Sequence, residues 1–412
     1  MQHRLLVLPR TMRYCACTKQ RICSSPKTGA MKSKRTLFIH IGWHKTASTL
    51  IQRYLHRYRA KLVDYDICYP VIDNQLEHGL IKHSDLLRSV FNALNPDRKL
   101  LKVRSFDELF DRSIEEIQSS NCRWAIISEE GLSETNPGIA GLMGRYRDHF
   151  DDIRIVAYLR RQDYFFEALY AQFVKQKLTR NTAYLDSYIQ RPEVRKRADY
   201  AQILDWWAEV FGRDRILVAP FERQTIVPDP LTFFFRLTGL PEKVLEELPP
   251  ARKEANVTPP REVTEFFRHM NLNRSDYAMK VLSEYLMQSG GAMTDTRYFC
   301  RADRERILED YGASNERVAR EYLQREDGIL FAEPVEEYPN CRETWQGLEP
   351  PEVLRYALPL CGVMSREIVQ LRSRIRALQN ENTGRVAVRR MKKICRRALN
   401  RWQRTAKKPK ST

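Results

Sequence analysis

Short apolar runs alternate with amphipathic segments over the first half of the chain. Four runs are almost continuously apolar, which is typical of strands covered on both faces; they are Thr36–Ile41, Trp124–Ser128, Ile153–Leu159 and Ile216–Pro220. Between them the apolar residues recur with a helical period at Ser48–Tyr58, Ser84–Ala93, Phe106–Ser119, Tyr164–Leu178 and Ala201–Phe211. Strands that alternate with helices predict an α/β fold with a mainly parallel central sheet.

The pattern becomes helical after Pro228, and the composition changes again near Glu333. Helices are predicted at Pro230–Leu237, Arg261–Met270, Ala278–Gln288 and Asp303–Leu323. The stretch that follows is rich in Pro and Glu, which favours a linker. The predicted organisation is therefore a basic leader (1–34), an α/β domain (35–332), a linker (333–363) and a basic helical tail (364–412).

The tail carries a short heptad pattern. Its apolar residues recur at spacings of four and three, at Met364, Ile368, Leu371, Ile375 and Leu378. This covers fewer than the ~3–4 heptads that indicate a coiled coil strongly. A basic segment follows Gly384. Three interpretations stay open for this tail: a solvated terminal helix, a contact with an anionic membrane surface, or self-association.

The net charge of +18 lies in the two ends of the chain. Residues 1–34 carry eight Lys or Arg and no acid, and residues 366–412 carry sixteen Lys or Arg and two acids. These two segments account for more than the whole excess, so the part between them is mildly acidic. A nucleic-acid-binding core is expected to carry its own basic face, and we therefore expect no nucleic acid as a partner.

The cysteines and the N-terminus bear on the compartment. The nine cysteines are scattered and odd in number, without the spacing of a zinc site, which favours a reducing compartment. The apolar piece Leu5–Leu8 is too short for the core of a signal peptide. We expect a cytoplasmic protein without a bound metal, whose basic tail is a candidate contact to the inner membrane surface.

The first apolar run leads into the segment "TLFIHIGWHKTASTLIQ", Thr36–Gln52. A strand that enters a helix through a Gly-started loop directs backbone N–H groups and the helix N-terminus at one point, which favours an anion. A nucleoside triphosphate loop has the pattern G-x-x-x-x-G-K-[ST]. Here Lys45 stands only three residues after Gly42, and a second Gly is missing. The segment therefore predicts an anion site with less room for a triphosphate and its metal.

This loop and three other segments resemble the sulfotransferases. "KTAST" at Lys45–Thr49 is similar to their 5′-phosphosulfate loop, and "IRIVAYLRRQDYFFEALY" at Ile153–Tyr170 is similar to their 3′-phosphate motif. "ILVAPFERQTIVPDPLTFFFRLTGLP" and "SNERVAREYL" resemble bacterial members that act on cell-surface glycans. The resemblance spans residues 35–330. It implies a three-layer fold related to P-loop kinases and 3′-phosphoadenosine 5′-phosphosulfate (PAPS) as the donor.

The resemblance also implies roles for individual residues. The 5′-phosphosulfate would be held by Gly42, His44, Lys45, Thr46, Ala47, Ser48 and Thr49. Lys45 would also offset the charge that grows on the leaving phosphate oxygen. Arg160 would pair with the 3′-phosphate. The Ser of the family motif falls at Ala168, which has no hydroxyl, and Arg161 is a candidate substitute.

A general base is expected just after a neighbouring strand. Glu129 and Glu130 follow Trp124–Ser128, and alternation along an extended chain predicts that they point to opposite sides. The resemblance aligns Glu130 with the base of the family. A carboxylate with an ordinary pKa of about 4.3 needs that pKa raised to work well near neutrality. His83 and His78 are rival candidates for the base or for acceptor binding.

The predicted function is transfer of a sulfuryl group from PAPS to a hydroxyl group, on a carbohydrate or a glycan precursor. A P-loop kinase or NTPase is the first alternative, and the absence of the G-K-[ST] pattern disfavours it. A catalytically inactive binding or scaffold protein of the same fold is the second, and Ala168 is the feature that favours it.

Overall fold

The computed structural model describes residues 34–72, 81–97, 103–176, 179–250, 260–272, 297–336, 350–380 and 391–397. The predicted helix Ala278–Gln288 and almost all of the predicted leader lie outside these residues.

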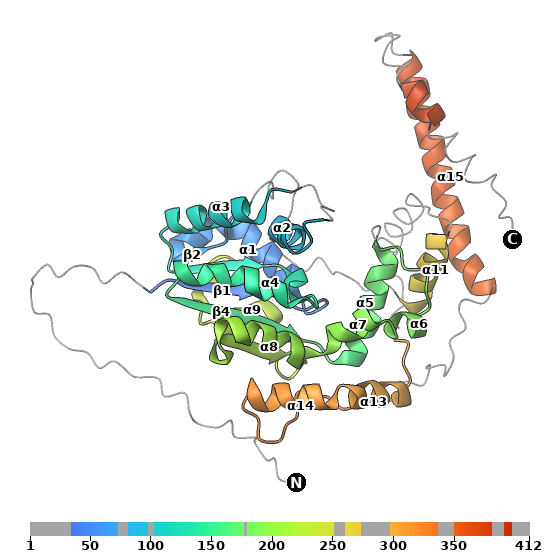
Figure 1. Cartoon of the computed structure of the whole chain (residues 1–412). Coiled ribbons are helices and arrows are strands. Elements are labelled where there is room, and N and C mark those ends of the chain that lie inside the picture. Colours follow the sequence, from blue (N-terminus) through green and yellow to red (C-terminus); the bar gives the residue numbers. More distant parts are fainter. Residues whose placement is uncertain are drawn as a thin grey trace, which may run out of the picture.

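Five parallel strands form the central sheet (Figure 1). They are β1 (Thr36–His40), β2 (Ile67–Cys68), β3 (Trp124–Ser128), β4 (Asp152–Leu159) and β5 (Ile216–Pro220), in the order β2-β3-β1-β4-β5. The predicted α/β class with a parallel sheet is confirmed, and the four apolar runs are its four longer strands. The two-residue β2 was not predicted, because two residues are too few to show a period.

Fourteen α-helices have bounds within the described residues. They are α1 (Ser48–Leu62), α2 (Ser84–Leu94), α3 (Phe106–Ser119), α4 (Pro137–Met143), α5 (Gln162–Lys175), α6 (Leu185–Ile189), α7 (Pro192–Arg195), α8 (Tyr200–Phe211), α9 (Pro230–Thr238), α10 (Lys243–Glu247), α11 (Arg261–Leu272), α13 (Arg301–Asp310), α14 (Gly312–Glu321) and α15 (Pro350–Asn380). Short 3₁₀ turns are η1 (Val63–Tyr65), η2 (Glu130–Ser133), η3 (Gly144–His149), η4 (Lys196–Ala198) and η5 (Arg213–Arg215).

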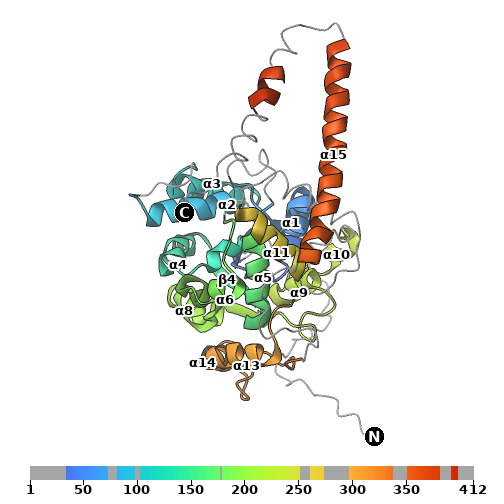
Figure 2. The ribbon, with the colours of Figure 1, turned by 90° about the vertical axis from the view of Figure 1, so that its right-hand side faces the viewer.

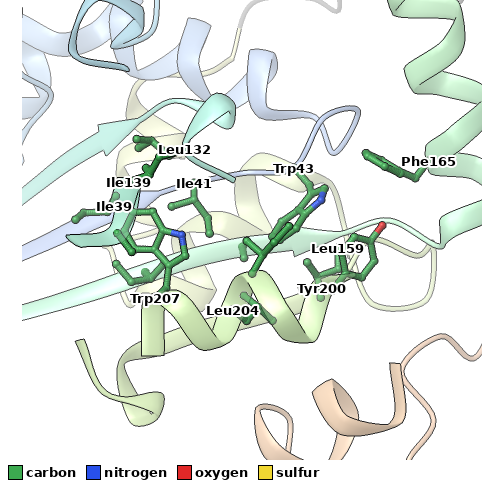
Figure 3. Packing of buried hydrophobic residues seen from close by; sticks show 14 of the residues in the cluster. Ile39, Ile41, Trp43, Leu132, Ile139, Leu159, Phe165, Tyr200, Leu204 and Trp207 are labelled. Atoms are coloured by element: carbon green, nitrogen blue, oxygen red, sulfur yellow. The ribbon is translucent and has the colours of Figure 1, made fainter. Parts of the chain in front are cut away.

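The sheet is buried on both faces, and alternate residues of each strand serve different layers. Leu37 and Ile39 of β1 belong to the apolar cluster that includes α2, α3, α4 and α8. Phe38, between them, belongs to a second cluster with α1, α9 and α10. Figure 3 shows Ile39 and Ile41 facing Leu204 and Trp207 of α8. Both faces of each strand therefore need apolar residues, which explains the continuous runs in the sequence.

The prediction for the segment Asp303–Leu323 needs correction. The single helix predicted at Asp303–Leu323 is two helices, α13 and α14, which meet at Tyr311. Gly312 disfavours a continuous helix at this point, and the buried Tyr311 hydroxyl donates to the Arg195 carbonyl at 3.0 Å.

The long helix α15 begins at Pro350, inside the segment predicted as a linker at 333–363. Proline is well tolerated in the first turn of a helix, where no backbone donor is needed, so a Pro-rich composition did not exclude a helix start. Ala357 and Met364 pack against the main apolar cluster. The rest of α15 extends away from the body of the molecule (Figures 1 and 2).

Candidate active site

Because the strands are parallel, their carboxyl ends meet at one edge of the sheet, where α/β proteins bind ligands. The loop 42–47 follows β1, and Glu129 and Glu130 follow β3. Arg160 follows β4, and the segment 221–229 follows β5. The fold therefore brings most of the predicted site residues to this edge.

The loop after β1 is a compact turn with several left-handed residues. Gly42, Lys45 and Ala47 have φ angles of 50°, 70° and 62°. A Cβ atom at Gly42 would also approach the Ser48 Oγ to 2.7 Å, so the position requires glycine. The Thr46 hydroxyl donates to the Trp43 carbonyl at 2.7 Å. The Thr46 hydroxyl proton is therefore used within the loop.

Trp43 fixes the loop to the body of the molecule. Its side chain is 1% exposed, and its Nε1 donates to the Arg197 carbonyl at 3.0 Å. Its ring meets the Tyr200 ring edge-on, with centroids 5.0 Å apart (Figure 3). The Tyr200 hydroxyl donates to the carbonyl of Arg160. The Trp43–Tyr200 pair therefore holds the loop after β1 and Arg160 together, which are the two parts of the predicted anion site. The pair was not predicted from the sequence. The only hint was a large apolar residue inside a polar loop.

The N-terminus of α1 has no side-chain cap and no acidic residue in its first turn. Its N-cap residue is Ala47, which has no side chain to cap the helix. The backbone N–H groups of a first helical turn lack partners within the helix. Ser48 Oγ is buried and also has no hydrogen-bond partner in the described part of the chain.

Unpaired polar atoms gather around this loop. Besides Ser48 Oγ, the buried atoms His40 Nε2, His44 Nδ1 and Gln52 Oε1 have no partner among the described residues. Buried polar side-chain atoms are nearly always paired in folded proteins. A concentration of exceptions at a helix N-terminus indicates a place where a polar ligand or water completes the bonds.

Lys45 and Arg160 converge on the same point. Arg160 Nη1 donates to the Lys45 carbonyl at 2.8 Å. Burial, together with the neighbouring charges of Arg160 and Lys175, lowers the pKa of Lys45 to about 8, although Glu130 acts in the opposite direction. An arriving anion would relieve this repulsion.

A cavity of about 970 Å³ lies beside Arg160. Arg160, Tyr164 and Ala168 line one wall, and Phe221 and Arg223 after β5 line another. The size is at the upper end of small-molecule sites and suits a nucleotide. Ala168 lines the cavity, so the position of the family Ser does face this space, but it presents a methyl group.

Two of the carboxylates that line the cavity, Glu167 and Glu222, are already engaged as acceptors. Glu167 Oε1 accepts from the backbone N–H of Tyr298 at 2.7 Å and from Arg304 at 2.8 Å. Glu222 accepts from the N–H groups of Ala332 and Glu333. Since these acids are satisfied by the protein, they oppose an anionic ligand less than their number suggests.

Arg161 does not line this cavity, contrary to the expectation that it substitutes for the missing Ser. Its Nε and Nη2 both bond Asp163 at 2.9 Å, and its Nη1 donates to the carbonyl of Glu333 at 2.7 Å. Arg304 joins the same Asp163 at 2.6 Å. Asp163, two residues after Arg161, is therefore the anion with which this arginine pairs. Arg161 therefore holds the segment at Glu333 against the start of α5.

The two carboxylates after β3 converge on Lys82 instead of pointing to opposite sides. Lys82 Nζ lies 2.8 Å from Glu129 Oε1 and 3.3 Å from Glu130 Oε2. The prediction was wrong because the extended chain ends at Glu129 and the turn η2 begins at Glu130. Lys82 was not predicted, since nothing in its sequence surroundings shows which carboxylates it meets.

The shared lysine affects the two carboxylates differently. Burial raises the pKa of Glu129, and Lys82 opposes this rise. Burial also acts to raise the pKa of Glu130, but Lys82, the 2.9 Å bond from Gln52 Nε2, and His44 together lower it to about 2. Glu130 is therefore ionised at neutral pH and is a weak base as long as these partners remain in place.

His83 is bound within the structure on both sides of its ring. Its Nδ1 accepts from the Ser128 N–H at 2.9 Å, which leaves the hydrogen on Nε2, 2.9 Å from the Pro70 carbonyl. The side chain is 1% exposed, and burial lowers its pKa to about 4. This geometry leaves no nitrogen for an acceptor, so it does not support His83 as the base. His78 lies outside the described residues.

The described residues include no group of three or more His, Cys, Asp or Glu placed to hold a metal ion. No helix among them is both long and apolar enough to cross a membrane.

Comparison with known proteins yields distant similarities. No protein-family model matches the chain. An uncharacterised protein of Archaeoglobus fulgidus is 28% identical over 244 residues, which are 56% of this chain and 62% of that protein. The match therefore spans less than two thirds of that relative's length. A solved sulfotransferase from Alicyclobacillus acidocaldarius covers 60% of this chain and 96% of its own, at 18% identity and a TM-score of 0.37. A likeness at this level identifies neither a site nor an activity.

Proposed function

We propose that the protein transfers a sulfuryl group from PAPS to a hydroxyl group, on a carbohydrate or a glycan precursor. The observation that supports this most is the uncapped N-terminus of α1. The unpaired Ser48 hydroxyl lies in its first turn, the Lys45 carbonyl just before it accepts from Arg160, and Arg160 lines a cavity of nucleotide size. The sequence motifs of this edge resemble the sulfotransferases at the same positions.

The residues fit a donor with two anionic ends. Lys45, the Ser48 hydroxyl and the N–H groups of the first turn of α1 would hold the 5′ end. Arg160 would hold the 3′-phosphate, and Arg223 also lines the cavity. When bound, the donor supplies an activated sulfuryl group attached to a phosphate oxygen. Lys45, with a pKa of about 8, is mostly protonated at neutral pH and can neutralise negative charge on that oxygen.

Glu130 is the carboxylate that we assign as proton acceptor. The Glu130 side chain lies next to the loop: a Cβ atom added at Gly42 would lie 3.3 Å from the Cβ of Glu130. Its low pKa makes it inefficient while Lys82 and Gln52 hold it. We therefore infer that an acceptor hydroxyl must displace one of these partners before Glu130 removes its proton.

The two alternatives differ in what the structure offers them. A kinase or NTPase loop uses the hydroxyl oxygen after the lysine as a magnesium ligand. Here the Thr46 hydroxyl is bound within the loop, where it donates to the Trp43 carbonyl and its oxygen accepts from the Trp43 N–H at 3.3 Å. These contacts disfavour the kinase. Ala168 in the cavity wall favours an inactive protein that binds the donor weakly.

Transfer of radioactive sulfate from PAPS tests the proposal. The chain and its Lys45→Met variant are incubated with the labelled donor and a panel of hydroxyl acceptors that includes oligosaccharides. Label in a carbohydrate, lost in the variant, is the expected result. Bisphosphate binding without any labelled product would favour the inactive protein, and ATP hydrolysis that requires magnesium would favour the NTPase.

A further inference from the structure

An apolar stripe on α15 is exposed where the helix leaves the body. Ile368 is 47% exposed and Leu371 is 53% exposed. The helix is fixed to the body before this point, through Ala357 and Met364, and extends away from it afterwards (Figures 1 and 2). A contiguous exposed apolar stripe of this kind marks a contact surface.

The residues of the stripe follow the pattern of a parallel two-stranded coiled coil. Ile368 and Ile375 occupy position a of a heptad, and Leu371 occupies position d. β-Branched residues at a combined with leucine at d favour two parallel strands over larger assemblies. The sequence places Leu378 at the next d position.

The charges beside the stripe support the same arrangement. Glu367 is at position g and Arg372 at position e, five residues further along. No residue three or four positions from either carries the opposite charge, so neither has an ion-pair partner along its own helix. In a parallel dimer, a g residue lies next to the e residue of the following heptad of the other chain.

We propose that α15 pairs with the same helix of a second copy of this chain as a short parallel coiled coil. Ile368, Leu371 and Ile375 form the interface, and Glu367 pairs with the partner's Arg372. The seam is short, so the dimer forms in a concentration-dependent way. The parallel arrangement places the two basic tails at the same end. This inference does not depend on the proposed sulfuryl transfer.

Sedimentation of the full-length chain over a range of concentrations tests the pairing. We expect the mass to rise from one chain to two, and Ile368→Ser and Leu371→Ser to remain monomeric. Val369→Ser is the matched control, because Val369 is 60% exposed but lies at position b, off the seam; this variant should dimerise like the wild type. A wild type that stays monomeric, or a dimer that survives the two seam variants, would overturn the proposal.

Charge reversal tests the register. Glu367→Arg and Arg372→Glu should each weaken the dimer by about tenfold, because two ion pairs become two repulsions. The double variant should restore the wild-type dissociation constant. If the dissociation constant of the dimer is the same in all three variants as in the wild type, the parallel register is contradicted. A monomeric chain that sediments with vesicles of anionic lipid only when Ile368 is present would assign the stripe to a membrane and overturn the proposal.

Discussion

At the scale of single residues, Ala168 is the position where the cavity departs most clearly from the resemblance. It lines the same cavity as Arg160, so a hydroxyl introduced there would face a bound 3′-phosphate. Ala168→Ser should tighten binding of adenosine 3′,5′-bisphosphate by about tenfold, the effect of one hydrogen bond to a charged group. Calorimetric titration measures it, and adenosine 5′-monophosphate, which lacks the 3′-phosphate, is the control. Equal tightening of both ligands would mean that Ala168 does not face a 3′-phosphate.

Lys82 is the cation that neutralises the two buried carboxylates Glu129 and Glu130. Lys82→Met removes the shared cation, and we expect the free energy of unfolding at pH 7 to fall by about 2 kcal/mol. That is less than the ~3–5 kcal/mol of a fully buried pair, because the Lys82 side chain is 31% exposed. Urea unfolding measures the loss, and Lys61→Met, an exposed position on α1, should change little.

The same variant has a defined pH dependence. The pKa of Glu130 is lowered in the folded state to about 2, so its contribution to stability is complete above its ordinary value and is lost as the pH falls toward 2. Lys82→Met raises that pKa. The difference in stability between wild type and variant should therefore shrink between about pH 5 and pH 3. A difference that stays constant over this range would contradict the assignment of Lys82 as the partner of Glu130.

At the scale of elements, the position of the β1–α1 loop depends on Trp43, which bonds the Arg197 carbonyl in η4 and meets the Tyr200 ring of α8. Trp43→Phe removes the bond to the Arg197 carbonyl, and we expect bisphosphate binding to weaken by about tenfold as the loop loses its position. Trp207→Phe is the matched control, because Trp207 is also buried, at 2% exposure, but lies beside Ile39 and away from Trp43 (Figure 3). Both variants should lose stability. Equal binding by the two variants would show that the anchor does not position the loop.

The elements that could be predicted from the sequence are those whose pattern is local. β1, β3, β4 and β5 are buried on both faces and are continuously apolar, and α3 has the predicted bounds with a capping box at Ser105. The β1–α1 loop could be found because its Gly, Lys and hydroxyl residues are contiguous. Pairings between distant residues leave no local pattern and could not be predicted. Examples are Lys82 with Glu129, and Arg304 with Asp163, which is 141 residues away from it in the chain.

At the scale of the whole molecule, the candidate site and the exposed stripe of α15 belong to different parts of the chain. The site lies at the carboxyl edge of the sheet, and the stripe begins where α15 leaves the body (Figure 1). We therefore expect Ile368→Ser to abolish dimerisation without changing the affinity for adenosine 3′,5′-bisphosphate. Calorimetry at a concentration where the wild type is dimeric tests this separation. A loss of affinity in the monomeric variant would show that the two parts are coupled.

The most direct test of the account is calorimetric titration of adenosine 3′,5′-bisphosphate into the wild type, Lys45→Met and Lys61→Met. We expect the wild type to bind the bisphosphate, Lys45→Met to bind it roughly tenfold to hundredfold more weakly, the effect of a lost charge-assisted bond, and Lys61→Met to bind it like the wild type. ATP with magnesium should bind far more weakly than the bisphosphate. A wild type that does not bind the bisphosphate, a Lys45→Met variant that binds it with wild-type affinity, or binding of magnesium–ATP alone would contradict a PAPS site at this loop.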